Sequence, residues 1–147
     1  MGSLSLPASS VVYIDTAPLI YSVEKHPEYE SSLRPLWAAS KSGEIQVITS
    51  ELALLETLVG PLKHGDSVLA DVYSELLTAT EMRLLPITLD VLRDAARLRA
   101  DTNMKTPDAI HAATALAAGC DLFVTNDGGF RRVASLPVVI ISEVAQA

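Results

Sequence analysis

Four acidic side chains could together carry out metal-assisted hydrolysis if folding brought them to one place. Each pair of unit charges about 4 Å apart repels by about 4 kcal/mol at an effective dielectric constant near 20, so such a cluster needs protonation or a bound cation. Carboxylate oxygens suit Mg²⁺ or Mn²⁺, whereas the single cysteine and three scattered histidines offer no zinc-site spacing. The four residues are Asp15, Glu56, Asp108 and Asp127.

Two of these acids follow runs of residues typical of buried parallel strands. Asp15 comes directly after Val11–Ile14, and Asp127 comes two residues after Leu122–Thr125. In an open parallel sheet, ligands bind beyond the carboxyl ends of the strands, so folding can unite these two positions. An aspartate after a strand is also a common helix N-cap, which explains either residue alone equally well. Thr16 is a further candidate N-cap for the helix that follows.

The other two acids lie on predicted helices. Asp108 lies in the first turn of a helix over residues 106–118, where the helix dipole stabilises a carboxylate without any function. This helix has hardly any polar surface, so we expect it to be buried, with its start facing solvent or a site. Glu56 borders an apolar helix face, and spacing alone puts it only modestly ahead of Glu51, which lies at a first helical position.

Strand-like and helical segments alternate along the chain. This alternation predicts an α/β fold with a central, mainly parallel sheet of four to five strands and helices on both faces. The helix that begins at residue 51 is expected to end at Val59, because Gly60 and Pro61 oppose its continuation. We expect strands at residues 11–14, 45–48, 82–85, 122–125 and 137–141, a helix that starts near residue 16, and further helices at about 28–42, 51–59, 66–77, 88–99, 106–118 and 129–134.

The composition fits one domain of ordinary size. The chain has 147 residues, of which 49% are hydrophobic, so we expect a single domain over residues 11–147 after a flexible N-terminal tail at 1–10. Eighteen acidic and eleven basic residues give a net charge of −7, which argues against binding DNA or anionic lipid by bulk charge. One cysteine excludes an internal disulfide framework, and no apolar segment is long enough to span a membrane. We therefore expect a cytoplasmic protein.

Four segments together resemble the motifs of the PIN-domain ribonucleases, and in particular the VapC toxins of toxin–antitoxin pairs. The segments are Val12–Thr16, Thr49–Pro61, Thr106–Ala113 and Val124–Phe130, which agree with the family in order and spacing. The resemblance implies a PIN-like three-layer αβα fold and Mg²⁺- or Mn²⁺-dependent hydrolysis of phosphodiester bonds in RNA. It also implies a small antitoxin partner and a homodimer. The alternative is a catalytically silent domain of the same fold, retained for RNA binding or protein docking.

The resemblance also assigns roles to individual residues. Carried over position by position, it makes Asp15, Glu56, Asp108 and Asp127 the acids of the site, with the three aspartates as metal ligands. It thereby favours Glu56 over the alternative acid on the same helix. Its supporting hydroxyls are Thr125 and Thr16.

An acidic protein that holds RNA needs positive charge close to the site. Basic residues before Asp108 and after Asp127 are candidate phosphate contacts, although arginines on helix surfaces are commonly only solvated. His111 could also reach the site, but a lone histidine on an alanine-rich helix is more often packed or hydrogen-bonded. The apolar faces of residues 28–42 and 66–77 could contact a partner or belong to the core. The candidate phosphate contacts are Arg93, Arg97, Arg99, Lys105, Arg131 and Arg132.

Overall fold

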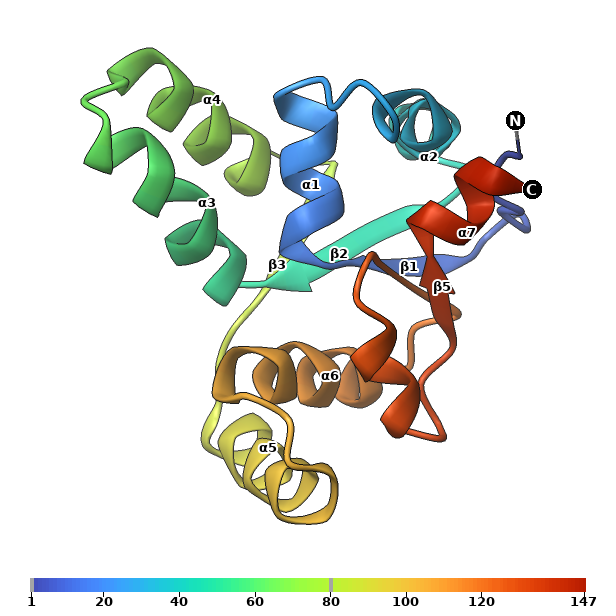
Figure 1. Ribbon diagram of the computed structural model, residues 1–147, viewed down its shortest axis with the longest axis vertical. Helices are drawn as coiled ribbons and strands as arrows, with labels where there is room; N and C mark the ends of the chain where they lie inside the picture. Colours follow the sequence, from blue (N-terminus) through green and yellow to red (C-terminus); the bar gives the residue numbers. More distant parts are fainter. Residues whose placement is uncertain (1, 80) are drawn as a thin grey trace.

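A computed structural model describes residues 2–79 and 81–147, and within these ranges five parallel strands form one sheet in the order β3-β2-β1-β4-β5 (Figure 1). Helices cover both faces, so the predicted three-layer arrangement is confirmed. No helix in the described ranges is long and apolar enough to cross a membrane. The strands are β1 (Val11–Ile14), β2 (Gln46–Ser50), β3 (Met82–Leu85), β4 (Leu122–Thr125) and β5 (Val138–Ile140). The helices are α1 (Thr16–Val23), α2 (Glu30–Ser42), α3 (Leu52–Lys63), α4 (Ser67–Thr78), α5 (Leu89–Thr102), α6 (Thr106–Ala118) and α7 (Ile141–Gln146), with a 3₁₀ turn η1 (Gly128–Arg132).

The two faces of β1 contribute to two different cores. Val12 and Ile14 lie in the core beneath α1, α2, α4 and α7, whereas Tyr13 lies in the core beneath α5 and α6. Successive side chains of a strand point to opposite faces of the sheet, and all three of these are fully buried. Burial on both faces explains why this run contains no charged residue.

The strand order reverses at β1. From β1 the chain builds β2 and β3 on one side, and it returns to place β4 and β5 on the other side (Figure 1). Ile14 at the end of β1 pairs with Val124 in β4, so the carboxyl ends of these two strands lie next to each other. Ligands of open α/β sheets bind at such a reversal.

Several predicted element boundaries agree closely with the structure. The helix α6 spans Thr106–Ala118 as predicted, and Gly119 just after it adopts a left-handed conformation with φ 63°. At the start of α1, however, the N-cap is Asp15 rather than Thr16, because the Asp15 carboxylate accepts a hydrogen bond from the Thr16 backbone. The cap position thus brings this carboxylate to the end of β1.

The prediction that Gly60 and Pro61 end the third helix is wrong. The helix α3 continues through both residues to Lys63. Proline removes one backbone donor, but Pro61 is buried, and the next turn still forms, with His64 N donating to Gly60 O at 3.1 Å. Packing of the ring therefore outweighs one missing hydrogen bond. The short α7 after β5 was not predicted either.

The N-terminal segment expected to be a loose tail makes contacts with the domain. Leu4 is only 8% exposed and belongs to the core, and Ser9 N donates to Glu44 O at 2.7 Å. Met1 lies outside the described residues. The described part of this segment therefore lies against the rest of the protein.

Candidate active site

Asp15 is held at the end of β1 by hydrogen bonds to both of its carboxylate oxygens. Its Oδ1 accepts from Thr16 N at 2.8 Å, and its Oδ2 accepts from Thr125 Oγ1 at 2.7 Å. Its own backbone N donates to Val124 O in β4 at 2.9 Å. Asp15 is 8% exposed and Thr125 is fully buried. The side chain thus has a fixed orientation where β1 and β4 meet.

Asp127 is connected to the same hydroxyl. Its backbone N donates to Thr125 Oγ1 at 3.1 Å, and its Oδ1 accepts from Gly129 N at 2.8 Å. Thr125 therefore bridges the backbone of one predicted acid and the carboxylate of another. Asp127 is exposed and forms the N-cap of η1.

Glu56 reaches this region from α3. Its Oε1 accepts from Thr16 Oγ1 at 2.8 Å and lies 2.6 Å from His111 Nε2. Partial burial would raise the pKa of this carboxyl, but the hydrogen bonds and the charge of His111 outweigh burial, so the pKa is lowered. The described residues give Oε2 no hydrogen bond. Glu56 therefore has one oxygen held and one available.

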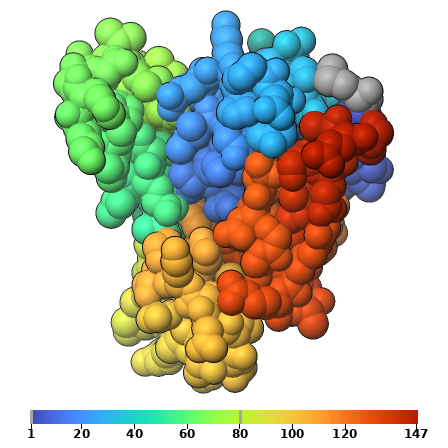
Figure 2. Space-filling model, in the orientation of Figure 1, coloured from blue at the N-terminus to red at the C-terminus, as the bar shows by residue number. Residues whose placement is uncertain are grey.

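Asp108 lies in the first turn of α6 and is half-buried. Its pKa is raised, first by burial and then by the negative charges of Asp15, Asp127 and Glu56, with His111 acting in the opposite sense. Asp108 thus senses the charge of all three other predicted acids. The segments that carry the four acids meet on one face of the molecule (Figure 2).

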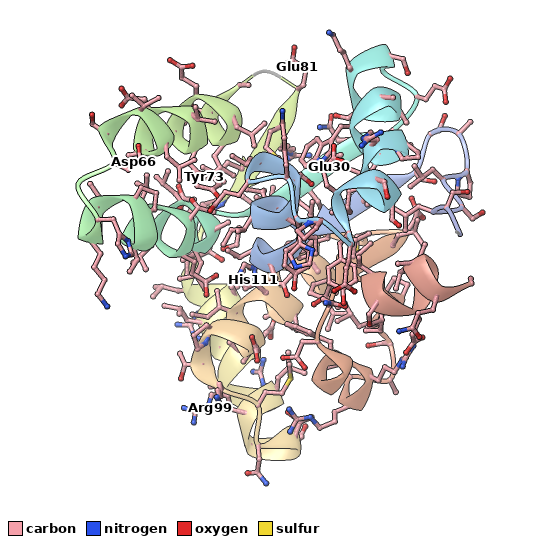
Figure 3. The ribbon with its side chains drawn as sticks, turned by 45° about the horizontal axis from the view of Figure 1, so that its top comes forward. Glu30, Asp66, Tyr73, Glu81, Arg99 and His111 are labelled. Atoms are coloured by element: carbon pink, nitrogen blue, oxygen red, sulfur yellow. The ribbon has the colours of Figure 1, made fainter. Side chains whose placement is uncertain are left out.

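His111 lies at the centre of these contacts, one turn after Asp108, where α1, α3 and α6 come together (Figure 3). It is 1% exposed, with Tyr13 OH 2.6 Å from Nδ1 and Asp15 Oδ1 3.7 Å from Nε2. Burial lowers the pKa of this ring, but the bond to Glu56 and the charges of the carboxylates outweigh burial and raise it. The sequence indicated that His111 could reach the site but favoured a packed or hydrogen-bonded ring, and it gave Tyr13 no role there.

Glu51, the alternative acid on this helix, lies away from the site. It is exposed, and its Oε1 accepts from Ile87 N at 3.2 Å, beside the end of β3. The structure therefore brings Glu56, and not Glu51, to Thr16 and His111.

The acids of the site have the charge and the oxygen ligands that a hard divalent cation prefers, but their side chains are not arranged around a common metal position. Within the described residues, the ion-pair partner of Asp15 and Glu56 is the His111 ring, and neither has an arginine or lysine within ion-pair distance. Burial first, and then repulsion from the other acids, raises the pKa of Asp108, and such a cation would relieve the repulsion. Within residues 2–79 and 81–147, no group of three or more histidine, cysteine, aspartate and glutamate side chains is arranged so that it could hold a metal ion. The carboxylates of Asp15 and Glu56 instead contact hydroxyl and imidazole groups of neighbouring side chains.

The candidate phosphate contacts differ in how far their charge is already paired. Arg93, Arg97 and Arg131 form ion pairs with Asp90, Asp94 and Glu143, respectively, so their charge is partly neutralised.

Two further arginines of this set bond to backbone carbonyls instead. Arg99 Nε donates to Met104 O at 2.9 Å, and Arg132 donates to Gly129 O and Thr102 O at 3.0 and 2.9 Å. Lys105 is exposed at the N-cap of α6. Lys105 lies three residues before Asp108 in the chain and Arg132 lies five residues after Asp127, so both remain candidates for phosphate contact.

Comparisons with known proteins agree with this architecture. A model of the PIN domain matches residues 12–136, and no curated protein matches the sequence. The structure is similar to VapBC2 from Rickettsia felis bound to a promoter DNA fragment, with 18% identity, 88% of this chain and 98% of that chain covered, and a TM-score of 0.72. It is also similar to DNA-bound VapBC from Salmonella typhimurium, with 18% identity, 89% and 98% covered, and a TM-score of 0.73. A third similar structure is Mycobacterium tuberculosis VapC20, a toxin that cleaves the sarcin–ricin loop, with 19% identity, 85% and 95% covered, and a TM-score of 0.71.

Proposed function

Because the chain belongs to the PIN domain family, we propose that it is a divalent-metal-dependent ribonuclease and the toxin of a toxin–antitoxin pair. The observation that carries this proposal is that Thr16 and Thr125 connect Asp15 to Glu56 and to the backbone of Asp127. Asp108 lies close enough for burial, and then the charges of these acids, to raise its pKa. Among the described residues, none of these four acids forms an ion pair with an arginine or lysine, and such acids suit metal-assisted hydrolysis of a polyanion.

The three aspartates would hold Mg²⁺ or Mn²⁺ directly or through water, and Glu56 would bind the ion or orient the attacking water. When bound, such an ion eases the deprotonation of water and neutralises charge on the phosphate. The protein supplies the orientation of the acids. The Thr125 hydroxyl donates to Asp15 and accepts from the Asp127 backbone, so one buried side chain sets the relation between two proposed ligands. Thr16 relates Asp15 to Glu56 in the same way, through its backbone N and its hydroxyl.

The proposed substrate is RNA, held by local positive charge beside the acids. A single strand bound through its phosphates needs cations near the scissile bond, although the net charge of the protein is −7. We assign this role first to Arg132 and Lys105. Arg132 donates to two backbone carbonyls and forms no ion pair with an acid among the described residues, which leaves its charge for a phosphate.

The proposed partners are a small antitoxin and a second copy of the chain. Two of the similar solved structures are VapBC complexes, which supports a protein partner of this class. The helices α3 and α4 expose large apolar side chains that a partner could cover. The other candidate contact face from the sequence, on α2, exposes no large hydrophobic side chain among the described residues. The exposed residues are Leu55, Val59, Leu62, Val68 and Val72.

Cleavage of a total-RNA pool by the purified protein, with Mg²⁺ or Mn²⁺ and with EDTA, tests this proposal. We expect cleavage with metal, none with EDTA, and none by Asp15→Asn. Glu51→Gln, at the N-cap of α3, is a matched control, because it lies away from the site and should cleave like the wild type. An active, well-folded Asp15→Asn protein would contradict the assignment. A protein that binds RNA or a partner without cleaving would support the silent-module alternative.

A further inference from the structure

His111 has no part in the function proposed above, yet it makes very short contacts at the site. Nε2 lies 2.6 Å from Glu56 Oε1, and Nδ1 lies 2.6 Å from Tyr13 OH. The ring is 1% exposed and lies edge-on to Tyr13 at 5.8 Å. Buried polar groups are normally hydrogen-bonded, and here both ring nitrogens have a partner. The partners of the two nitrogens indicate which of them carries a proton.

Hydrogen-bond chemistry assigns the protons along this chain of groups. An ionised carboxylate can only accept, so the contact with Glu56 requires a proton on Nε2. In the neutral ring, Nδ1 then carries the lone pair and accepts from the Tyr13 hydroxyl. The Tyr13 oxygen in turn accepts from Ser50 N at 3.1 Å. Each donor has an acceptor from β2 through β1 and α6 to α3.

We infer that Tyr13 and His111 form a positioning relay for Glu56, in which Tyr13 selects the ring tautomer and His111 Nε2–H holds Oε1. Oε2 then stays free for the ion or the attacking water. The inference rests on the proposed function, which gives Glu56 that task. Both relay residues act through Glu56 and are positioning residues.

The anchors of the relay are more deeply buried than the group it holds. Tyr13 is fully buried in the central strand and stacks on Phe123, with ring centroids 5.0 Å apart and an interplanar angle of 10°. Glu56 instead extends from α3, whose neighbouring Leu55 and Val59 are exposed. A glutamate has more rotamer freedom to lose than an aspartate, so a fixed donor has more to contribute here.

The first test reads the tautomer by ¹⁵N NMR of histidine in alkaline buffer, with neither metal nor RNA. We expect His111 to be protonated at Nε2 alone, and Tyr13→Phe, which keeps the ring, to give a mixture of tautomers. The exposed His64 should not change and serves as an internal control. A wild-type ring protonated at Nδ1, or a tautomer unaffected by Tyr13→Phe, would overturn the relay.

The second test compares His111→Leu with His111→Gln in RNA cleavage. Loss of a group that orients a metal-site ligand typically costs about 10–100-fold, and we expect that loss in kcat for the leucine variant, with KM within about twofold. The glutamine amide can replace Nε2–H and should restore most of kcat, with His64→Gln as the matched control. Equal loss in both His111 variants, or full activity of the leucine variant, would overturn the relay.

Thermal unfolding checks that each variant is folded, and Tyr13→Phe supplies a cleavage measurement should the leucine variant not fold. We expect Tyr13→Phe to lower kcat with KM unchanged, and an unchanged kcat would count against the relay. A wild-type protein inert toward RNA would overturn the proposed function, while the tautomer measurement would still decide the relay.

Discussion

Carboxylates on α5 and carboxylates at the site have the same charge in very different surroundings. Asp90 and Asp94 on α5 are exposed and have arginine partners at 3.2 and 2.7 Å, and such surface pairs contribute about 0–1 kcal/mol. Asp108 is half-buried, and its pKa is raised by burial and by its acidic neighbours. A carboxylate whose charge is already paired with an arginine gains little from a bound cation. A carboxylate without such a partner gains more when a cation binds.

The largest expected effect comes from Asp108→Asn. Loss of this charge should lower metal-dependent RNA cleavage at least about 100-fold, comparable to the loss of a single transition-state contact. The same change removes repulsion from the folded state, so the melting temperature of the metal-free protein should stay equal or rise. Cleavage rates and thermal unfolding measure the two effects. Asp90→Asn on α5 is the control and should change neither. A cleavage-competent Asp108→Asn protein would remove the distinction between the two regions.

The next effect concerns stability at Thr125. Thr125→Val removes the donor to Asp15 Oδ2 and the acceptor of Asp127 N in a fully buried position. Leaving buried polar groups without partners costs about 1–3 kcal/mol, which should appear in the free energy of unfolding from urea titration. Thr125→Ser keeps the hydroxyl and should lose much less. Equal losses in the two variants would show that the methyl group matters rather than the hydroxyl.

The pH dependence of stability should have opposite signs at Asp108 and Glu56. A raised folded pKa makes ionised Asp108 destabilising, so Asp108→Asn should gain stability relative to wild type as pH rises above the ordinary value of 3.8, and reach a constant difference above the raised value. Glu56 has a lowered pKa, so its contribution exists above its ordinary value of 4.5 and is lost as pH falls through the folded value. Unfolding of wild type, Asp108→Asn and Glu56→Gln in EDTA across acidic pH measures both. Parallel curves would contradict the electrostatic account.

The smallest effect distinguishes paired from unpaired arginines. Arg132→Gln should reduce the slope of log RNA affinity against log salt by about 0.7, the value for one phosphate contact to a single strand. Arg93→Gln with Arg97→Gln should change the slope by less, because their charges are already paired with Asp90 and Asp94. Binding of the Asp15→Asn protein to labelled RNA at several salt concentrations measures the slopes. A larger change for the α5 pair would reverse this ranking.

Much of the fold could be predicted because local signals and burial agree. The apolar run before Asp15 and the proline and glycine that bracket α6 lead to the same elements in the structure. Pro61 shows where this agreement fails. Its low helix propensity is a local property, whereas the packing that keeps it within α3 depends on the tertiary structure. Residue spacing alone could not separate Glu56 from Glu51 either, because their difference depends on which face of α3 meets α1 and α6.

The contacts of His111 lay beyond sequence reasoning for a similar reason. Its partners Tyr13 and Glu56 lie 98 and 55 positions away in the chain, and each is ordinary in its own segment. In the sequence, Tyr13 resembles the other apolar residues of its strand. Only the strand register shows that its hydroxyl lies beside α6. Such a network is visible only once strand order and helix rotation are known.

The alanine-rich packing of α6 makes the chemistry of the site depend on the buried face of this helix. Ala109, Ala112 and Ala113 are buried against α5 and the sheet, and close-packed interiors accept added methylene groups poorly. The same helix carries Asp108 and His111, so a bulkier residue on its inner side would displace both together. Substitutions such as Ala112→Val therefore offer a route to temperature-sensitive alleles, in which heating disables the protein while every polar group of the site is still encoded.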